Sequence, residues 1–198
     1  MRITDHRYTG EIDRFRLAIR MISHEARTGT IRCFTGLSED RIRKLYGTYF
    51  KFDETRQIKR RRGKSPTQIS GFINSTARQF ESTVLVCMFI LCRAAEHNAE
   101  GLAARATGID EVQLGERVCA AFEIYQLLHP QPQYSFERAW GLFHALTAVQ
   151  EICLSHCEHC DGSYIQDRYA LNYHVCPCCE LKDEALQADN NTARRGGH

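Results

Sequence analysis

The stretch CEHCDGSYIQDRYALNYHVCPCC, residues 157–179, holds five of the ten cysteines of this 198-residue chain. Cys157 and Cys160 form one Cys-x-x-Cys pair, Cys176 and Cys179 form a second, and fifteen residues separate the two pairs. This spacing is typical of structural zinc sites, because each two-residue gap presents two thiolates to one ion. The intervening residues cannot build a core alone, so the ion would supply stabilisation, about 10–16 kcal/mol in zinc-finger peptides.

The sequence supports two other uses of these cysteines, disulfide bonds and a redox dithiol, less well than it supports zinc binding. Disulfide bonds need an oxidising compartment, yet the N-terminus lacks the apolar segment of a secretory signal. A redox dithiol would need a βαβ unit, which the sequence does not predict. Four further cysteines lie within apolar patterns, where we expect reduced thiols in the core: Cys33, Cys87, Cys92 and Cys119.

A catalytic zinc site is also disfavoured. His156-Cys157-Glu158 matches the first half of the zinc deaminase signature, but Pro177 does not begin the Pro-Cys-x-x-Cys of the second half. Four thiolates would also fill the coordination shell and leave no position for water. Cys153 and Cys178 are surplus, and Cys178 could replace Cys176 or Cys179 only with worse spacing. Three histidines are near enough to replace a thiolate, although roles at the surface or as hydrogen-bond partners of the sulfurs are favoured: His156, His159 and His174. We therefore expect a structural ion and no catalytic residue.

Charge is distributed unevenly along the chain. The formal net charge is only +2, but residues 1–64 hold 17 basic and 8 acidic side chains, whereas the remainder holds 9 basic and 16 acidic ones. A basic half suggests a polyanionic partner for that half, although a solvated charged surface gives the same composition. With 43% hydrophobic residues and no apolar run of about 18, we expect a soluble intracellular protein without a membrane span.

Residues 28–50, TGTIRCFTGLSEDRIRKLYGTYF, have the outline of a helix-turn-helix. The first segment ends at Gly36, Ser38 is a good N-cap, and the two acidic residues that follow suit the positive end of a helix. In that helix Ile42 would face the core, and three basic side chains would face outward: Arg41, Arg43 and Lys44. Many helical hairpins share this pattern without binding DNA, so the pattern alone leaves the partner open.

Residues 51–71 read as a basic linker that is punctuated by glycine and proline. Five positive charges fall within six of its residues, at Lys59, Arg60, Arg61, Arg62 and Lys64. Directly after a basic helix such a run is well placed to lie against phosphates, although a solvated loop has the same composition.

The remaining pattern predicts a mainly α protein in three parts: a helical domain over residues 1–154, a four-cysteine zinc module over 155–180 and a flexible tail over 181–198. Core helices occupy residues 72–154. The first runs over 72–98, the second begins at a cap on Asp110, and the third runs from a cap on Ser135 to about residue 154. A small zinc ribbon-like module is therefore appended to a helix-turn-helix-like body.

Together these motifs resemble the FlhC family, the flagellar transcriptional activator subunits of bacteria. The resemblance covers about residues 13–179, and its most specific parts are LSEDRIRKLY (37–46), Arg138-Ala139-Trp140, Leu154-Ser155, Gly162 and the two cysteine pairs. The basic run IKRRRGK (58–64), the extra Cys178 and the tail depart from the family pattern.

The resemblance implies a cytoplasmic protein that binds one zinc ion through Cys157, Cys160, Cys176 and Cys179. It also implies a hetero-oligomer with the FlhD subunit, described for the family as a heterohexamer, which binds flagellar promoters and recruits RNA polymerase. We therefore expect a DNA-binding activator subunit and not an enzyme. The candidate DNA contacts are Arg41, Arg43, Lys44, Lys59, Arg60, Arg61, Arg62, Lys64 and, in the zinc module, Arg168. The alternative is a zinc-stabilised adaptor whose basic segment docks on an acidic protein.

Overall fold

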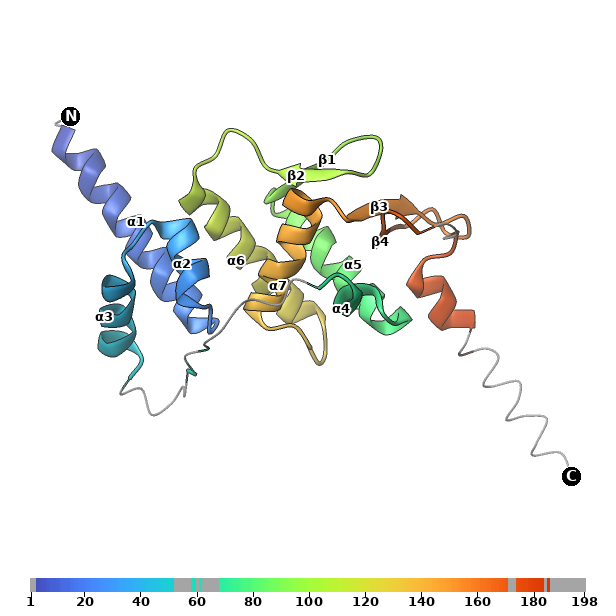
Figure 1. The fold of residues 1–198 in the computed structure, drawn as a ribbon, viewed down its shortest axis with the longest axis horizontal. Coiled ribbons are helices and arrows are strands. Elements are labelled where there is room, and N and C mark those ends of the chain that lie inside the picture. Colours follow the sequence, from blue (N-terminus) through green and yellow to red (C-terminus); the bar gives the residue numbers. More distant parts are fainter. Residues whose placement is uncertain are drawn as a thin grey trace, which may run out of the picture.

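The computed structural model describes residues 3–51, 58, 59, 61, 68–170, 174–183 and 185. The molecule is elongated, with α1–α3 at one end, α4–α7 in the middle and the β3–β4 hairpin toward the other end (Figure 1). Within the described residues the only sheets are two antiparallel hairpins, so the predicted mainly α fold class is confirmed. None of the helices in this part of the chain has the length and apolarity needed to cross a bilayer.

Three helices form the N-terminal end: α1 (Ile3–Ser23), α2 (Thr28–Thr35) and α3 (Glu39–Tyr49). The last two are the predicted helix-turn-helix pair. Gly36 ends α2 in the left-handed conformation, with φ of 65°, and the Ser38 side chain accepts a hydrogen bond from the backbone N–H of Arg41. Ile42 is buried on the inner side of α3, so the polar side of this helix faces outward.

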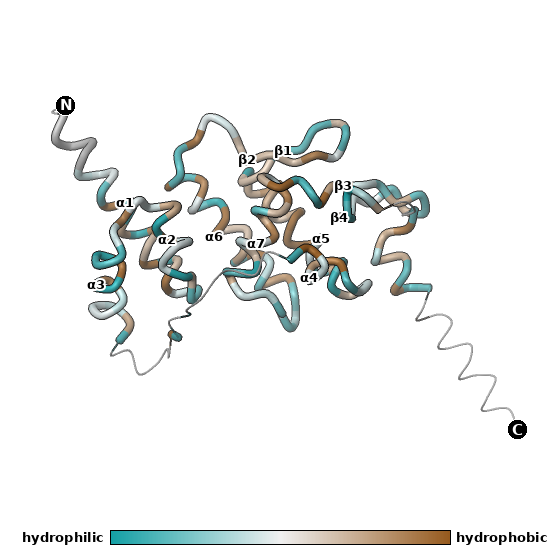
Figure 2. Tube along the Cα trace, viewed as in Figure 1, coloured by the Kyte–Doolittle hydropathy of each residue, from teal (hydrophilic) through white to brown (hydrophobic). Residues whose placement is uncertain are grey.

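The middle of the molecule is built on α4 (Ser70–Ile73), α5 (Thr76–Leu91), α6 (Glu111–Leu128) and α7 (Phe136–His144). Figure 2 shows the most hydrophobic part of the trace along α5, which packs against α6, α7 and β4. The predicted caps are present, because Asp110 forms a capping box with Gln113 and the Ser135 side chain accepts from the backbone N–H of Arg138.

The predicted continuous helix over 72–98 is wrong at both ends. Ser75 is extended and caps α5, which separates it from α4. Arg93 adopts a left-handed conformation, with φ of 56°. The N–H of Arg93 donates to the carbonyl of Ile90 and that of Ala94 to the carbonyl of Phe89, which is the Schellman pattern of a helix end. The chain then forms β1 (Ala95–His97) and β2 (Ala103–Arg105).

The predicted helix from Ser135 to about residue 154 is also too long. After α7 a π-helical turn (Ala145–Val149) ends at Gln150, which has φ of 55°. The chain continues as β3 (Ile152–His156), which pairs with β4 (Ser163–Asp167) in register from Ile152 opposite Asp167 to His156 opposite Ser163. Strand pairing and burial of the apolar side chains therefore override the local helical pattern.

The loop of the β1–β2 hairpin lies on the backbone of β3. The N–H of Leu154 donates to the carbonyl of Gly101 at 2.9 Å. Gly101 has φ of 74°, and a Cβ at this position would collide with the carbonyl oxygen of Leu154. The contact therefore requires glycine, both for its conformation and for the close approach of the two backbones.

The cysteines outside the cluster follow the prediction in part. Cys119 is buried, and Cys87 and Cys92 are partly buried, as expected for core thiols. Cys33 is exposed on α2, so its placement in the core was wrong. Its neighbour Phe34 fills the inner side of this short helix instead.

Candidate metal centre and nucleic-acid interface

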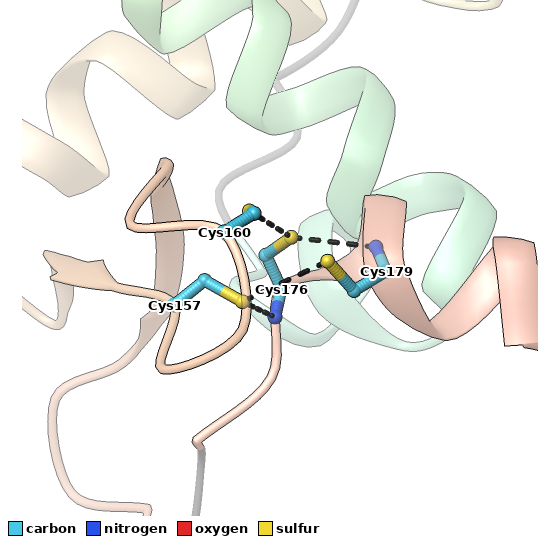
Figure 3. Close-up of side chains that lie close together, drawn as sticks. All are labelled: Cys157, Cys160, Cys176 and Cys179. Carbon is cyan, nitrogen blue, oxygen red and sulfur yellow. Dashed lines mark hydrogen bonds between the residues drawn. The ribbon is translucent and has the colours of Figure 1, made fainter.

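The structure brings the four cysteines of the two Cys-x-x-Cys pairs into one cluster (Figure 3). Their sulfur atoms all lie within 4.8 Å of one another. The Sγ atoms of Cys157 and Cys179 are 3.9 Å apart, and those of Cys160 and Cys176 are 3.7 Å apart. Each close contact therefore joins one cysteine of the first pair to one cysteine of the second.

The first cysteine pair lies in the turn that joins β3 to β4. The N–H of Asp161 donates to the carbonyl of Cys157 at 2.8 Å, and the N–H of Cys157 donates to the carbonyl of Gly162 at 3.1 Å. Asp161 is left-handed, with φ of 56°. Because β3 precedes the first cysteine pair, the β3–β4 hairpin that carries the site starts before the cysteine stretch. The sequence pattern alone did not indicate that these two strands pair.

The second cysteine pair lies at the start of a short helix, residues 177–183. The N–H of Glu158 donates to the carbonyl of His174 at 2.9 Å, which holds the two cysteine-bearing segments together. Tyr164 is buried beside Cys157 and Cys176 and forms with them a small core that is separate from the main one. The helix extends into the region that the sequence assigned to the tail, since residues 181–183 are helical.

Several backbone N–H groups point at the sulfurs. The N–H of Cys176 donates to Sγ of Cys157 at 3.2 Å, and the N–H of Cys179 donates to Sγ of Cys176 at 3.4 Å. Burial opposes ionisation of Cys157, but backbone hydrogen bonds from Cys176, His159 and Cys160 outweigh it and lower its pKa to about 6. Contacts with the sulfurs of Cys160 and Cys176 raise the pKa of Cys179 to about 12. The backbone therefore favours the thiolate form of Cys157, whereas the neighbouring sulfurs oppose ionisation of Cys179.

This geometry fits a tetrahedral metal ion. Zinc–sulfur bonds are about 2.3 Å long, so an ideal tetrahedron has sulfur atoms about 3.8 Å apart. The two short sulfur contacts, at 3.7 and 3.9 Å, match that edge. Four thiolate donors with N–H hydrogen bonds also form a closed structural shell, without a position for a substrate. The cluster can therefore hold a metal ion in a structural role.

The other candidate ligands stay outside this cluster. His174 Nδ1 pairs with Glu158 Oε1 at 2.7 Å. Cys153 lies on β3, opposite Gln166 of β4. Cys178 is partly buried against the small core and is not part of the four-sulfur group.

The hairpin is attached to the helical core through α5. The side-chain amide of Gln79 donates to the carbonyl of Ile165 at 2.7 Å, and the N–H of Ile165 donates to the hydroxyl of Thr83 at 3.2 Å. Ile152, Leu154 and Ile165 belong to the main hydrophobic core. The metal-binding ribbon therefore shares its inner face with the helical body.

The predicted basic residues of α3 are exposed, as expected, but two of them are paired with acids. Arg41 lies 3.0 Å from Glu11 of α1 and stacks over the ring of Phe15 at 5.5 Å from its centroid. Arg43 pairs with Asp40 and Glu39, at 3.0 and 3.3 Å. Lys44 is on the same helix. Ion pairs this exposed are weak, so phosphates can replace the acids at small cost.

Of the predicted linker residues, Lys59 and Arg61 are described, and Arg60, Arg62 and Lys64 lie outside the described residues. Glu25, which follows α1, binds both: its carboxylate accepts from the N–H of Lys59 at 3.1 Å and from Nε of Arg61 at 2.8 Å. The sequence analysis missed Glu25. A single acidic residue after a helix carries no periodic signal that would have identified it.

Arg168 lies on a different element from the other basic candidates. It follows β4 at the end of the hairpin opposite to the cysteines, and its N–H donates to the carbonyl of Glu151. The hairpin and α3 are at opposite ends of the long axis (Figure 1), so Arg168 and the α3 residues do not form one patch.

A basic helix-turn-helix-like end on a helical core, with a four-cysteine site on the far side, is typical of the class of nucleic-acid-binding transcription regulators. Comparison with family models supports a role as a transcription regulator. The FlhC model, described as flagellar transcriptional activator, matches residues 4–192, and the chain therefore belongs to this family. It is a family of transcription regulators and not of enzymes. A search of curated proteins finds no match.

Proposed function

We propose that this chain is the DNA-binding subunit of a cytoplasmic transcription activator, which acts in a hetero-oligomer with FlhD at flagellar promoters and recruits RNA polymerase there. The observation that carries this proposal is the exposed basic side of α3, whose opposite side packs into the core through buried Ile42. The membership of the chain in the FlhC family supports the same function. No enzymatic step is part of the proposal.

In this proposal zinc is the ion of the four-cysteine cluster. Cys157, Cys160, Cys176 and Cys179 would hold it, and it would supply the charge that lets four neighbouring thiols ionise. The consequence is structural: residues 157–162 are fixed to residues 174–179, and the small core around Tyr164 is closed. The hairpin is thereby kept folded against α5.

The proposed DNA contacts are Arg41, Arg43, Lys44, Lys59, Arg60, Arg61, Arg62, Lys64 and Arg168. The α3 group is the candidate for base reading, because helices of helix-turn-helix pairs fit the major groove. The linker group would neutralise phosphates, which fixes register without reading sequence. A duplex that touches both α3 and Arg168 would have to follow the long axis of the molecule.

The test is a titration of the complex with duplex DNA against salt. The chain is co-expressed with FlhD, the mass of the assembly is measured, and binding to a flagellar promoter fragment is followed at several salt concentrations. We expect binding that weakens steeply as salt rises, since phosphate contacts release counterions. Binding that is absent or insensitive to salt contradicts the proposal.

The second candidate is a zinc-stabilised adaptor that binds only proteins. The intramolecular pairing of Arg41 and Arg43 with acidic residues favours it, because the same arginines could donate to carboxylates of a partner protein. So does the exposure of Leu127 and Leu128 at the end of α6 (86% and 59%). An assembly that binds FlhD but no DNA supports this candidate.

A further inference from the structure

The basic linker is attached to the N-terminal end of the molecule at one described point. Ile58 packs against the main core and shares a small cavity with Ile22, Ile42 and Tyr46. The hydroxyl of Tyr46 donates to the carbonyl of Ile58 at 2.8 Å. The apolar side chain of Ile58 and one hydrogen bond from the Tyr46 hydroxyl to its backbone carbonyl therefore hold residue 58 against α1 and α3.

Glu25 holds the two described basic residues that follow. Its Oε1 accepts from the N–H of Lys59, and its Oε2 accepts from Nε of Arg61. The Glu25 side chain is 25% exposed, whereas that of Arg61 is 50% exposed. The carboxylate thus sits at the base of the segment, while the cation stays accessible to solvent.

The backbone of Glu25 gives an independent indication that this side chain has a role. Glu25 has φ of 59°. The N–H of Glu25 donates to the carbonyl of Ile22 and that of Ala26 to the carbonyl of Met21, so Glu25 occupies the left-handed position that ends a helix. Glycine is the usual residue there, because a side chain strains this conformation. A strained non-glycine residue at a helix end is reason to look for a function of its side chain.

We propose that Glu25, Ile58 and Tyr46 form an intramolecular dock that positions the chain's own basic segment for the phosphate backbone of DNA. The proposal rests on the proposed DNA-binding function and assigns these three residues to positioning rather than to contact with DNA. The dock fixes residues 58, 59 and 61, between which Arg60 lies in the sequence. Ordering of this segment before binding lowers the entropy cost of the phosphate contacts.

The test depends on the negative charge of Glu25, because its electrostatic effect and its positioning effect on DNA binding have opposite signs. Removal of an acidic side chain near a polyanion should by electrostatics alone strengthen binding. If Glu25 positions the segment, its removal weakens binding instead. Glu25→Gly also relieves the backbone strain, so the fold should keep its Tm or gain stability. Ile58→Ala removes the apolar anchor without a change of charge, and Asp13→Asn is the control that removes a different, exposed acidic charge of α1 at the same end.

We expect Glu25→Gly and Ile58→Ala, each in the full complex with FlhD, to raise the Kd for promoter DNA about three- to tenfold. The slope of the logarithm of the binding constant against the logarithm of the salt concentration should not decrease, because the bound variants contact the same phosphates as the wild type. Asp13→Asn should bind as the wild type does or more tightly. Hydrogen exchange of the Lys59 amide, measured without DNA, should be slower in the wild type than in Glu25→Gly.

Unchanged or tighter binding by Glu25→Gly, or unchanged binding by Ile58→Ala, overturns the dock while the proposed function stands. Equal exchange of the Lys59 amide in wild type and Glu25→Gly also overturns it. A wild-type complex without salt-dependent DNA binding overturns the proposed function, whatever the exchange data show.

Discussion

The carboxylate of Glu137, in the first turn of α7, caps α2 across 110 residues of sequence. Its Oε1 accepts from the backbone N–H of Arg27 at 2.6 Å, and its Oε2 accepts from the hydroxyl of Thr30 at 3.1 Å. Arg27, the N-cap residue of α2, makes no side-chain cap of its own. Glu137 is only 1% exposed, so the helical core directly fixes the start of the helix-turn-helix pair.

Replacement of Glu137 by Ala should therefore destabilise the chain by about 1–3 kcal/mol, because a partly buried N–H and a buried hydroxyl lose their acceptor. Urea unfolding measures the change. Glu100→Ala, on an exposed loop, is the matched control and should have little effect. Equal stability of the two variants would show that α2 does not depend on this cap.

Replacement of Cys157 or Cys176 by Ser should abolish metal binding and unfold the ribbon while α1–α6 stay folded. The reason is that each removed sulfur opens the four-donor shell that fixes the two cysteine segments. Metal content and thermal unfolding measure the effect. Cys178→Ser, next to a proposed ligand but outside the cluster, should keep its metal. Full metal retention by both Cys157→Ser and Cys176→Ser contradicts the assignment.

The double replacement Arg60→Ala with Arg62→Ala should lower affinity for all DNA sequences alike and reduce the salt slope by about two, if each arginine neutralises one phosphate. The control pair, Arg93→Ala with Arg105→Ala, removes two cations near the β1–β2 hairpin and should leave the slope unchanged. A loss of affinity that is confined to one promoter sequence would mean that these arginines read bases.

Stability should fall in acid partly through Glu123. Its carboxylate accepts from Nε and Nη2 of Arg20 at 2.8 and 2.6 Å and contacts the ring of His24, and these hydrogen bonds, that of Arg20 above all, lower its pKa from 4.5. A lowered pKa in the folded state gives stability that is present above the unfolded pKa and is lost as pH falls through the folded one.

We therefore expect Glu123→Gln to be less stable than the wild type at pH 7, by about 0.5–1 kcal/mol for so exposed a pair, and the difference to shrink as the pH falls from 4.5 through the lower pKa of the folded state. Urea unfolding at several pH values measures it. A difference that stays constant with pH would show that packing, and not ionisation, accounts for the contribution of Glu123.

The sequence predicted those parts of the fold that depend on neighbours along the chain. The caps at Ser38 and Asp110 and the end of the first helix at Gly36 are all set by residues within four positions. The four-cysteine cluster could be predicted for the same reason, since the two-residue gaps fix each pair locally.

The parts that could not be predicted depend on distant partners. Residues 152–156 continue a helical apolar pattern and become a strand only because 163–167 lie beside them. Glu137 and Glu25 are ordinary acidic residues in the sequence, and their roles follow from the backbone groups that the fold places in front of them. Likewise, the sequence listed Arg168 among the candidate DNA contacts, although it follows β4 on a hairpin that Figure 1 shows well apart from α3.

The contact between Gly101 and Leu154 has a consequence for inherited variation in this regulator. Any larger residue at 101 would push β3 outward, and β3 leads directly into Cys157. A mutation in this loop, which contributes no sulfur to the cluster, would then weaken metal binding. Screens for variants that lose the metal of the four-cysteine cluster should accordingly include this loop.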